Sequence, residues 1–355
     1  MTGPILLPAP DQCRFAVMGA GWHLCTLAEK LVEAGFPRPL VFTYPRVEHE
    51  RDRILLTDPR LYKNVFDTCD HLGIPVVDEK LDDAAMVARM LEAGCSAVFS
   101  LSWRRRITRT LIDAFPERIF NLHPSLLPKE RGSGTFSYRI LNGSREVSAT
   151  LHLVDEGLDT GPVILQQADE IAVNRPKPRD FLIATNDLYG RLMDRFLGTV
   201  LDGRPLQPRP QVEDDNTYLP LLHTETNGAI DWDWSADEIE RFIRAFGPPY
   251  PGAYTYVGET RFAVTEASLE PSPIAYHPYL AGRVVSLKTD GTAQVIARGG
   301  LLRLEEIAVE GERMAPARLL KHTSCLLTPR AVLDRARTAV LRAAQMNVPD
   351  IKGRQ

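Results

Sequence analysis

Several features that define other protein classes are scarce or missing in this chain of 355 residues. Its five cysteines form no CxxC or CxxH pair, and their odd number argues against a disulfide framework. The eight histidines occur without an HExxH motif and without clustered carboxylates. We therefore expect a reduced, cytoplasmic protein that uses no metal.

The chain also lacks long apolar runs and a large net charge of either sign. No run of about eighteen consecutive apolar residues occurs, so we expect no membrane span. The start, MTGPILLPAPDQCRFAV, lacks a basic region and contains three prolines, which favours a loose leader over a signal peptide. A net charge of -4 disfavours a protein whose main task is to grip nucleic acid.

The first hundred residues carry a regular alternation of apolar runs and amphipathic segments. The apolar runs predict strands at 14–19, 39–44, 74–77 and 96–101. Between them, apolar residues recur at three- and four-residue spacing and each segment ends in glycine, which predicts helices. This alternation predicts an α/β fold, a Rossmann-like and mainly parallel sheet with helices on both faces.

Further elements follow this alternation along the chain. We expect a strand at 118–123, a helix at 136–141, an antiparallel pair of strands at 148–155 and 162–171, and a long helix at 178–201. Next comes DGRPLQPRPQVEDDNTYLP, whose four prolines are too many for a helix or an inner strand. A linker is therefore predicted there.

Composition divides the chain into five parts. After the linker, Ser235 is a predicted helix N-cap, and five short strands separated by turns predict a small OB-like β-barrel. The expected parts are a leader at 1–12, an N-terminal domain at 13–202, a Pro-rich linker at 203–224, a C-terminal OB-like domain at 225–328, and a basic helix and tail at 329–355.

Two glycines after the first strand, Gly19 and Gly21, permit a dinucleotide-binding interpretation. The third glycine of that motif is missing, because Leu24 stands in its place, and no acidic residue closes the second strand. We favour the alternative that these glycines let the backbone turn tightly at the carboxyl edge of the sheet.

Polar side chains gather at the ends of two predicted strands. Asn121 and His123 lie one step apart on the same face of a strand, and Pro124 keeps that strand end extended. Further on, Thr150 and His152 share a strand face, and the turn DEGLDTG supplies carboxylates, among them Asp159. Satisfied polar groups at a strand end are the plain alternative. The combination of amide, imidazole and carboxylate at one sheet edge favours a catalytic site.

The same residues carry a resemblance to a known family. NLHPSLLPKERG followed by SATLHLVDEGLDTGPVILQ resembles the folate-dependent formyltransferases, and Asp159 follows Asn121 by 38 residues, which is that family's usual separation. Downstream, IDWDWSADEIERFIRAFGPPYPGAYT is similar to the start of the C-terminal domain found in the tRNA-formylating branch.

This resemblance implies roles for individual residues. Asn121 and His123 would stabilise an oxyanion, and Asp159 would hold the imidazole and accept a proton from the amine. Other residues would support the catalytic groups: Ser125, Thr150 and His152. Backbone and side chains near the sheet edge would contact the folate: Leu101, Ser102, Trp103, Arg104, Val154, Asp155, Glu156 and Gly157. A third group would face the second substrate: Lys129, Arg131 and Gly132.

The implied reaction moves a formyl group from 10-formyltetrahydrofolate to an amine, without a metal. An amino sugar on a nucleotide, or another small metabolite amine, is favoured as acceptor, because residues 225–355 hold 16 Lys and Arg against 16 Asp and Glu. Residues 131–138, which follow the Leu-Pro of the first motif, also read RGSGTFSY where tRNA enzymes typically read RGAAP. Methionyl-tRNA stays an alternative, a formyltetrahydrofolate hydrolase is a second, and a homodimer stays open.

Overall fold

The computed structural model describes residues 3–49, 58, 60–323 and 327. These residues form two compact units. The first contains the chain up to Thr135 together with 146–174 and 179–220; the second contains 136–145, 175–178 and the chain from Leu221 on. The expected basic helix at 329–345 lies outside the described residues.

A seven-stranded sheet forms the centre of the first unit, in the order β3-β2-β1-β4-β5-β7-β8. The strands β1 to β5 pair in parallel, whereas β7 pairs antiparallel with both β5 and β8. Their bounds are β1 (Arg14–Gly19), β2 (Leu40–Phe42), β3 (Val76–Val77), β4 (Cys95–Leu101), β5 (Ile119–His123), β7 (Glu146–Leu153) and β8 (Val163–Glu170).

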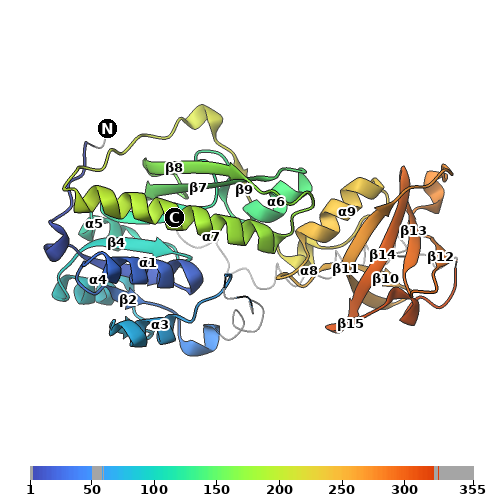
Figure 1. Ribbon diagram of the computed structural model, residues 1–355, viewed down its shortest axis with the longest axis horizontal. Coiled ribbons are helices and arrows are strands. Elements are labelled where there is room, and N and C mark those ends of the chain that lie inside the picture. The colour runs from blue at the N-terminus through green and yellow to red at the C-terminus, as the bar shows by residue number, and fades with distance from the viewer. Residues whose placement is uncertain (1–2, 50–57, 59, 324–326, 328–355) are drawn as a thin grey trace, which may run out of the picture. The chain divides into compact units, whose positions relative to one another are not determined.

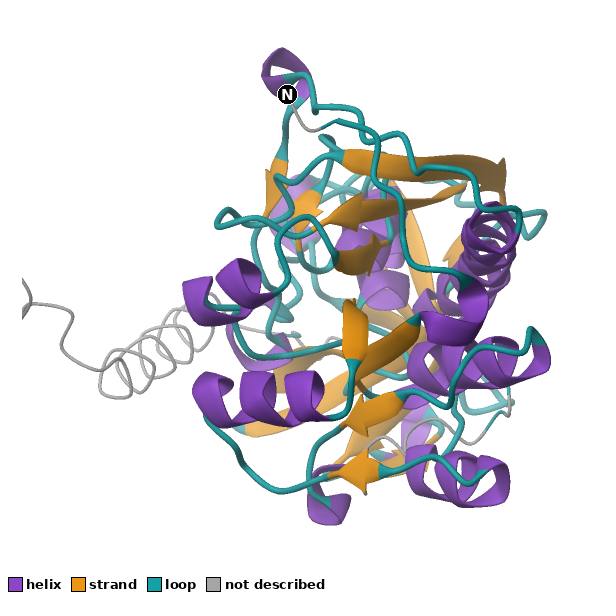
Figure 2. Cartoon of the chain, turned by 90° about the vertical axis from the view of Figure 1, so that its left-hand side faces the viewer, coloured by secondary structure: helices purple, strands orange, loops and turns teal. Residues whose placement is uncertain are grey.

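Helices lie on both sides of this sheet (Figure 2), which confirms the predicted Rossmann-like α/β architecture. They are α1 (Gly21–Glu33), α3 (Val65–Leu72), α4 (Asp83–Glu92), α5 (Arg109–Ala114) and α7 (Pro178–Leu201). Side chains begin two of them, since Asn64 accepts from the Phe66 amide at the start of α3 and Asp82 from the Ala85 amide at the start of α4.

The long helix α7 runs along the sheet (Figure 1), and aromatic rings pack between the two. The ring of Phe196 lies 5.1 Å from that of Phe99 and 4.9 Å from that of Phe120, and all three side chains are fully buried. Such edge-to-face contacts add to the stabilisation from burying the rings. The strands that end at the candidate site are therefore held by a rigid core.

Gly19 ends β1 where it passes close to β4. A Cβ atom there would lie 1.6 Å from the carbonyl oxygen of Leu101, and the Gly19 φ of 141° is one that side chains disfavour. The glycine therefore permits a close approach of two strands at the carboxyl edge of the sheet, as the tight-turn interpretation expected.

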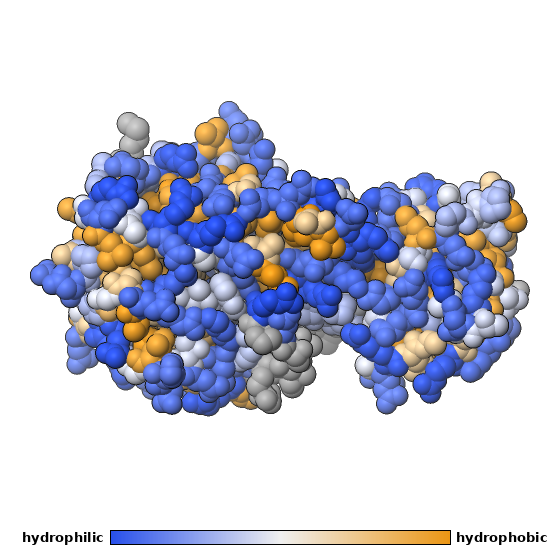
Figure 3. All heavy atoms as spheres, viewed as in Figure 1, coloured by the Kyte–Doolittle hydropathy of each residue, from blue (hydrophilic) through white to orange (hydrophobic). Residues whose placement is uncertain are grey.

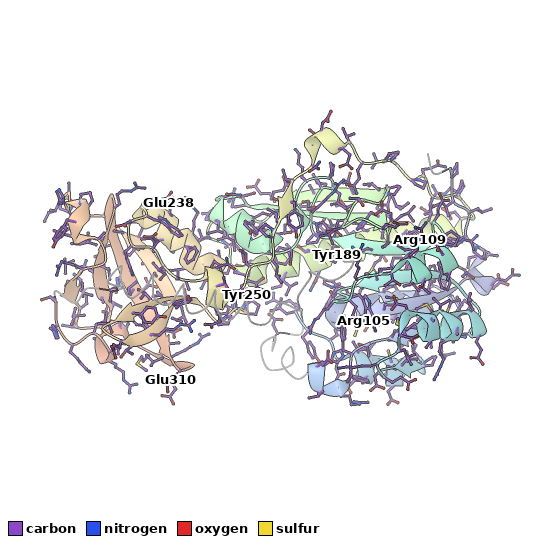
Figure 4. All side chains as sticks on the ribbon, turned by 180° about the vertical axis from the view of Figure 1, so that it is seen from behind. Arg105, Arg109, Tyr189, Glu238, Tyr250 and Glu310 are labelled. Atoms are coloured by element: carbon purple, nitrogen blue, oxygen red, sulfur yellow. The ribbon has the colours of Figure 1, made fainter. Side chains whose placement is uncertain are left out.

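The second unit contains a six-stranded antiparallel sheet, which confirms the predicted small β domain. It is built from β10 (Ala253–Val257), β11 (Thr260–Glu270), β12 (Val284–Leu287), β13 (Ala293–Ala297), β14 (Gly300–Val309) and β15 (Glu312–Met314). The last of these strands was not among the five expected. A tight turn at Glu310 and Gly311, both with positive φ, joins it to β14 (Figure 4).

Helix α9 (Ala236–Ala245) packs on this sheet, and its start confirms the predicted N-cap. The Ser235 side chain accepts from the Glu238 amide, and the Glu238 carboxylate accepts from the Ser235 amide, so a capping box closes the first turn. Helix α6 (Thr135–Leu141) belongs almost entirely to this unit, where the Ser137 hydroxyl donates to the carbonyl of Ala245 at 2.8 Å.

Two short strands were missed by the sequence patterns. The strand β6 (Arg131–Gly132) pairs in parallel with β9 (Tyr218–Leu219), which lies in the Pro-rich segment expected to be a linker. Two residues per strand are too few to leave an alternating pattern.

Hydrophilic residues predominate on the face drawn in Figure 3, with apolar residues in small patches. No helix in the described part of the chain combines the length and the apolar character needed to cross a bilayer.

Candidate active site

Asn121 and His152 form the centre of the candidate site. They are direct partners on β5 and β7, and the Asn121 Nδ2 lies 3.0 Å from the His152 Nε2. On the other side of the ring, His152 Nδ1 lies 2.7 Å from the carbonyl oxygen of Leu153. A carbonyl can only accept, so Nδ1 carries the proton and Nε2 accepts from the Asn121 amide.

Burial keeps this imidazole neutral. His152 is 2% exposed, and the desolvation lowers its pKa from 6.5 to about 4, against an opposing attraction from Asp159. A neutral ring preserves the acceptor at Nε2. One N–H of the Asn121 amide is therefore fixed by its hydrogen bond to His152. Because the amide group is planar, the direction of its second N–H is then fixed as well.

The carboxylate of Asp159 lies beside this pair. Its Oδ2 accepts from the Gly132 amide at 2.9 Å, and its Oδ1 lies 3.8 Å from the His152 Nε2. The Asp159 side chain is 12% exposed, and its backbone has a φ of 55°. A left-handed conformation is unusual for a residue with a side chain and occurs often at functional sites.

His123 faces Asp159 from the opposite side. Its Nδ1 lies 3.5 Å from the Asp159 Oδ2, and its Nε2 donates to the carbonyl of Glu130 at 2.7 Å. The ring is 4% exposed. His123 is therefore placed to act on the carboxylate, and it is not part of the pocket wall described below.

Ser125 and Thr150 are fully buried beneath these groups. The Thr150 hydroxyl donates to the carbonyl of Ser125 at 2.6 Å and accepts from the Leu127 amide at 3.2 Å. The Ser125 hydroxyl donates to the carbonyl of Lys129 at 2.6 Å. Both hydroxyls thus shape the turn that follows β5 and lie away from open solvent.

A pocket of about 700 Å³ opens at this edge of the first unit. Asn121, His152 and Asp159 line it, so two of the three expected catalytic side chains are in its wall. Six of the eight residues expected to contact folate also line it: Trp103, Arg104, Val154, Asp155, Glu156 and Gly157.

The other two expected folate contacts lie outside the wall. Leu101 is 1% exposed, and its carbonyl accepts from the Ala20 amide. The Ser102 hydroxyl lies 2.9 Å from Nδ1 of His23, whose Nε2 lies 2.9 Å from the Asn186 Oδ1. Since an amide oxygen accepts, His23 carries its proton on Nε2, and burial lowers its pKa to about 4.

Sequence reasoning missed part of the pocket wall. Arg105, Arg106 and Ile107 line the pocket next to Trp103, whose ring stacks on Tyr44 with centroids 5.1 Å apart. The run RRRI after a strand was a signal that could have extended the expected set. Figure 4 labels Arg105 and, at the start of α5, Arg109, whose Nη1 lies 3.3 Å from the Glu156 Oε1.

The three residues expected to face the second substrate, Lys129, Arg131 and Gly132, lie in different environments. Lys129 is exposed and Gly132 donates its amide to Asp159, but neither lines the pocket. Arg131 is 7% exposed, and its guanidinium is held by Gln211 and Glu213. Its geometry therefore assigns it to the protein interior rather than to a substrate contact.

Two sequence families match this chain. The formyl transferase family matches residues 14–178, and the formyl transferase C-terminal domain matches residues 223–323. Together they span both units. The chain belongs to the formyltransferase family. The site described above lies within the first match, so this formyltransferase carries its candidate catalytic residues in the N-terminal domain.

Solved structures with the same fold share little sequence with this formyltransferase. WlaRD, a sugar 3N-formyl transferase crystallised with dTDP and 5-N-formyl-THF, has a TM-score of 0.59 and 19% identity over 82% of this chain and 97% of its own. The N-formyltransferase from Helicobacter canadensis, in complex with folinic acid and dTDP-3-aminofucose, has a TM-score of 0.59 and 18% identity, covering 82% and 98%.

A third solved structure is that of a longer protein, of which this chain matches a part. HypX from Aquifex aeolicus, in complex with tetrahydrofolic acid, has a TM-score of 0.54 and 15% identity over 87% of this chain and 47% of its own.

Across the ranges that the structure describes, no group of three or more His, Cys, Asp or Glu side chains is arranged to hold a metal ion.

Proposed function

We propose that this formyltransferase moves a formyl group from 10-formyltetrahydrofolate to a primary amine. The single observation that carries the proposal is the convergence of Asn121, His152 and Asp159 in the wall of one pocket. The pocket volume of about 700 Å³ lies within the range of ligand sites. Trp103, Ile107 and Val154 supply apolar surface in a wall that is otherwise rich in charged and polar side chains, a combination that suits a flat pterin ring with polar edges.

Asn121 is the proposed oxyanion donor. When the amine attacks the formyl carbon, the carbonyl oxygen gains negative charge, and a preorganised N–H donor lowers the barrier. His152 holds one N–H of the Asn121 amide, so the amide cannot rotate away from the position of the oxyanion. The loss of one such donor costs about 10²- to 10³-fold in kcat.

Asp159 is the proposed proton acceptor. The amine nitrogen becomes positively charged on forming its bond to the formyl carbon, and Asp159 takes one of its protons directly or through water. As the oxyanion returns to a carbonyl, the carbon–nitrogen bond to the folate breaks, and the folate nitrogen takes up the proton that Asp159 accepted, directly or through water. The Gly132 amide donates to the Asp159 Oδ2, and His123 Nδ1 lies 3.5 Å from the same oxygen outside the pocket wall, so we propose that His123 acts through Asp159.

An amino sugar carried on a nucleotide is the proposed acceptor. Two proteins of the same fold were crystallised with dTDP or a dTDP-linked amino sugar, which supports this class of acceptor. The balanced charge of residues 225–355 is a second supporting observation, since a surface that binds tRNA is expected to carry a basic excess. Methionyl-tRNA is the alternative acceptor.

The test is turnover with a panel of amines. The full chain is incubated with 10-formyltetrahydrofolate and, separately, with nucleotide-linked amino sugars and methionyl-tRNA, and tetrahydrofolate release is followed. We expect turnover with an amino sugar and a loss of at least about 10²-fold in Asn121→Ala. Asn142→Ala, which removes an exposed asparagine, is the matched control and should behave as the wild type. Turnover with tRNA alone would exclude the proposed acceptor.

A further inference from the structure

The segment 209–219, here called the strap, runs beside the candidate active site within the first unit. At its start, Arg209 and Val163 exchange two backbone hydrogen bonds of 2.8 Å. At its end, β9 pairs with β6. Between these points the Thr217 hydroxyl accepts from the Glu130 amide at 2.8 Å. The strap is therefore bonded to the start of β8, which follows the Asp159 turn, and to the segment 130–132, which follows β5.

Gln211 of the strap holds the turn that contains Asp159. Its Nε2 donates to the carbonyl oxygens of Asp159 and Gly161, each at 2.8 Å. Two carbonyl acceptors identify this atom as the amide nitrogen. Both bonds act on the backbone where Asp159 takes its left-handed conformation, with a φ of 55°. Such a conformation persists where the surroundings determine it.

Arg131 fixes the amide of Gln211 in turn. The Gln211 Oε1 accepts from Arg131 Nη2 at 2.7 Å and from Nε at 3.1 Å. Glu213 closes the arrangement, because its two carboxylate oxygens accept from Arg131 at 2.8 and 3.0 Å. These charge-assisted bonds are directional, so the orientation of the Gln211 amide is set by groups that do not face the pocket.

Arg131 also links the strap to the carboxylate itself. It is the residue before Gly132, whose amide donates to the Asp159 Oδ2 at 2.9 Å. The strap thus holds the Asp159 backbone through Gln211 and the Asp159 side chain through β6. Gln211 and Arg131 are both absent from the pocket wall, so neither is placed to touch a substrate there.

From this geometry we infer that Gln211 is a positioning residue, which sets the direction of the Asp159 carboxylate for proton transfer. The inference rests on the proposed function, in which Asp159 accepts the proton of the amine. A residue of this kind acts on the rate of the chemical step, because a catalytic group displaced by about 1 Å can lose about 10²-fold in rate. The residues expected to contact folate, which lie at 103–104 and 154–157, precede the carbonyl groups of Asp159 and Gly161 that Gln211 holds, so folate binding should be preserved.

Gln211→Glu is the most specific variant. It keeps the size of the side chain and the acceptor for Arg131, but it removes both donors to the Asp159 turn. We expect kcat to fall about 10- to 100-fold, with little change in the KM for 10-formyltetrahydrofolate or in the affinity for 5-formyltetrahydrofolate. Gln211→Ala should lower kcat in the same direction. Val212→Ala, on the same strap and 62% exposed, is the matched control.

The outcomes separate this inference from the proposed function. If both Gln211 variants turn over like the wild type while Asp159→Asn does not, the inference is overturned and the function stands. An equal fall in kcat and in folate affinity would also overturn it, since that pattern indicates a general loosening of the pocket.

A second readout needs no turnover. Amide hydrogen exchange in the 157–161 turn should be faster in Gln211→Glu than in the wild type, and unchanged in Val212→Ala. Unchanged exchange in Gln211→Glu would overturn the inference even if no amine were found to accept a formyl group. Faster exchange together with wild-type kcat would overturn it as well.

Discussion

The two units each contain a carboxylate that is shielded from solvent. The Asp159 side chain in the first unit is 12% exposed, and the Glu240 side chain in the second unit is 4% exposed. Glu240 accepts from Arg244 through both oxygens, at 2.6 and 3.0 Å, and also from Arg175. Asp159 accepts one hydrogen bond among the described residues, from Gly132, and its two histidine neighbours stand 3.5 and 3.8 Å away.

This difference distinguishes a structural carboxylate from one available for chemistry. The guanidinium groups of Arg244 and Arg175 compensate the negative charge of Glu240. The bidentate pair with Arg244 leaves the Glu240 carboxylate little capacity for further partners. Asp159 is oriented but not saturated, so it can still accept a proton. Shielding from solvent alone therefore does not identify a catalytic group; the state of its partners does.

The largest expected effect comes from Asp159→Asn. It preserves shape and the bond from the Gly132 amide but removes the proton acceptor, so we expect kcat to fall by about 10³-fold, within the range of general-base catalysis. Thermal unfolding should change little. Asp70→Asn, at an exposed position on α3, should leave both quantities unchanged. If Asp159→Asn turned over at the wild-type rate, Asp159 would not be the proton acceptor, and the proposed contrast with the structural carboxylate Glu240 would be wrong.

Glu240→Ala should show the opposite pattern. It leaves Arg244, whose side chain is 11% exposed, without its buried partner, so we expect a loss of about 3 kcal/mol in the free energy of unfolding. Formyl transfer per folded molecule should stay at the wild-type level. Denaturant unfolding and turnover below the transition measure the two effects, with Glu259→Ala at an exposed turn as the control.

The third expected effect concerns pH, and per pH unit it is smaller than the loss expected in Glu240→Ala. The folded-state pKa of His152 is lowered to about 4 by burial, so the unfolded chain binds its proton first as the pH falls below 6.5. Stability should therefore decrease between pH 6.5 and 4, at a slope of up to about 1.4 kcal/mol per pH unit for this residue. His152→Gln should flatten the slope, measured by unfolding at several pH values.

Formyl transfer should fall only near pH 4, where the folded protein takes up a proton on His152. A proton on the His152 Nε2 turns an acceptor into a donor, which removes the partner that holds the Asn121 amide. His23, whose pKa is also lowered to about 4, adds to the loss of stability, so His23→Gln should flatten the stability slope as well. An unchanged slope in both variants would contradict this account of the acid response.

Much of the fold was predictable because its signals are local. Continuous apolar runs identified the buried strands β1 and β4, helical spacing identified the helices between them, and the serine before α9 predicted its start. The strands β6 and β9 were not predictable, because two residues carry no periodicity and their pairing joins positions 87 residues apart.

The candidate site divides in the same way between sequence and tertiary structure. The motifs around Asn121, His123 and Asp159 are a property of the sequence by itself, and their resemblance to the formyltransferases indicated the family and implied the chemistry. The structure decided which of them face the pocket: Asn121 and Asp159 line it, whereas His123 turns to the carbonyl of Glu130.

The fate of Arg131 and Gln211 was also decided only by the tertiary structure. A basic residue beside a glycine gave no sign that its guanidinium would be buried against a side chain 80 residues later. The physical reason is that residue type and spacing specify local geometry and chemical capacity. Partners far apart in the chain are chosen by how the sheet and the strap fold together, and those partners determine which polar group stays free to react.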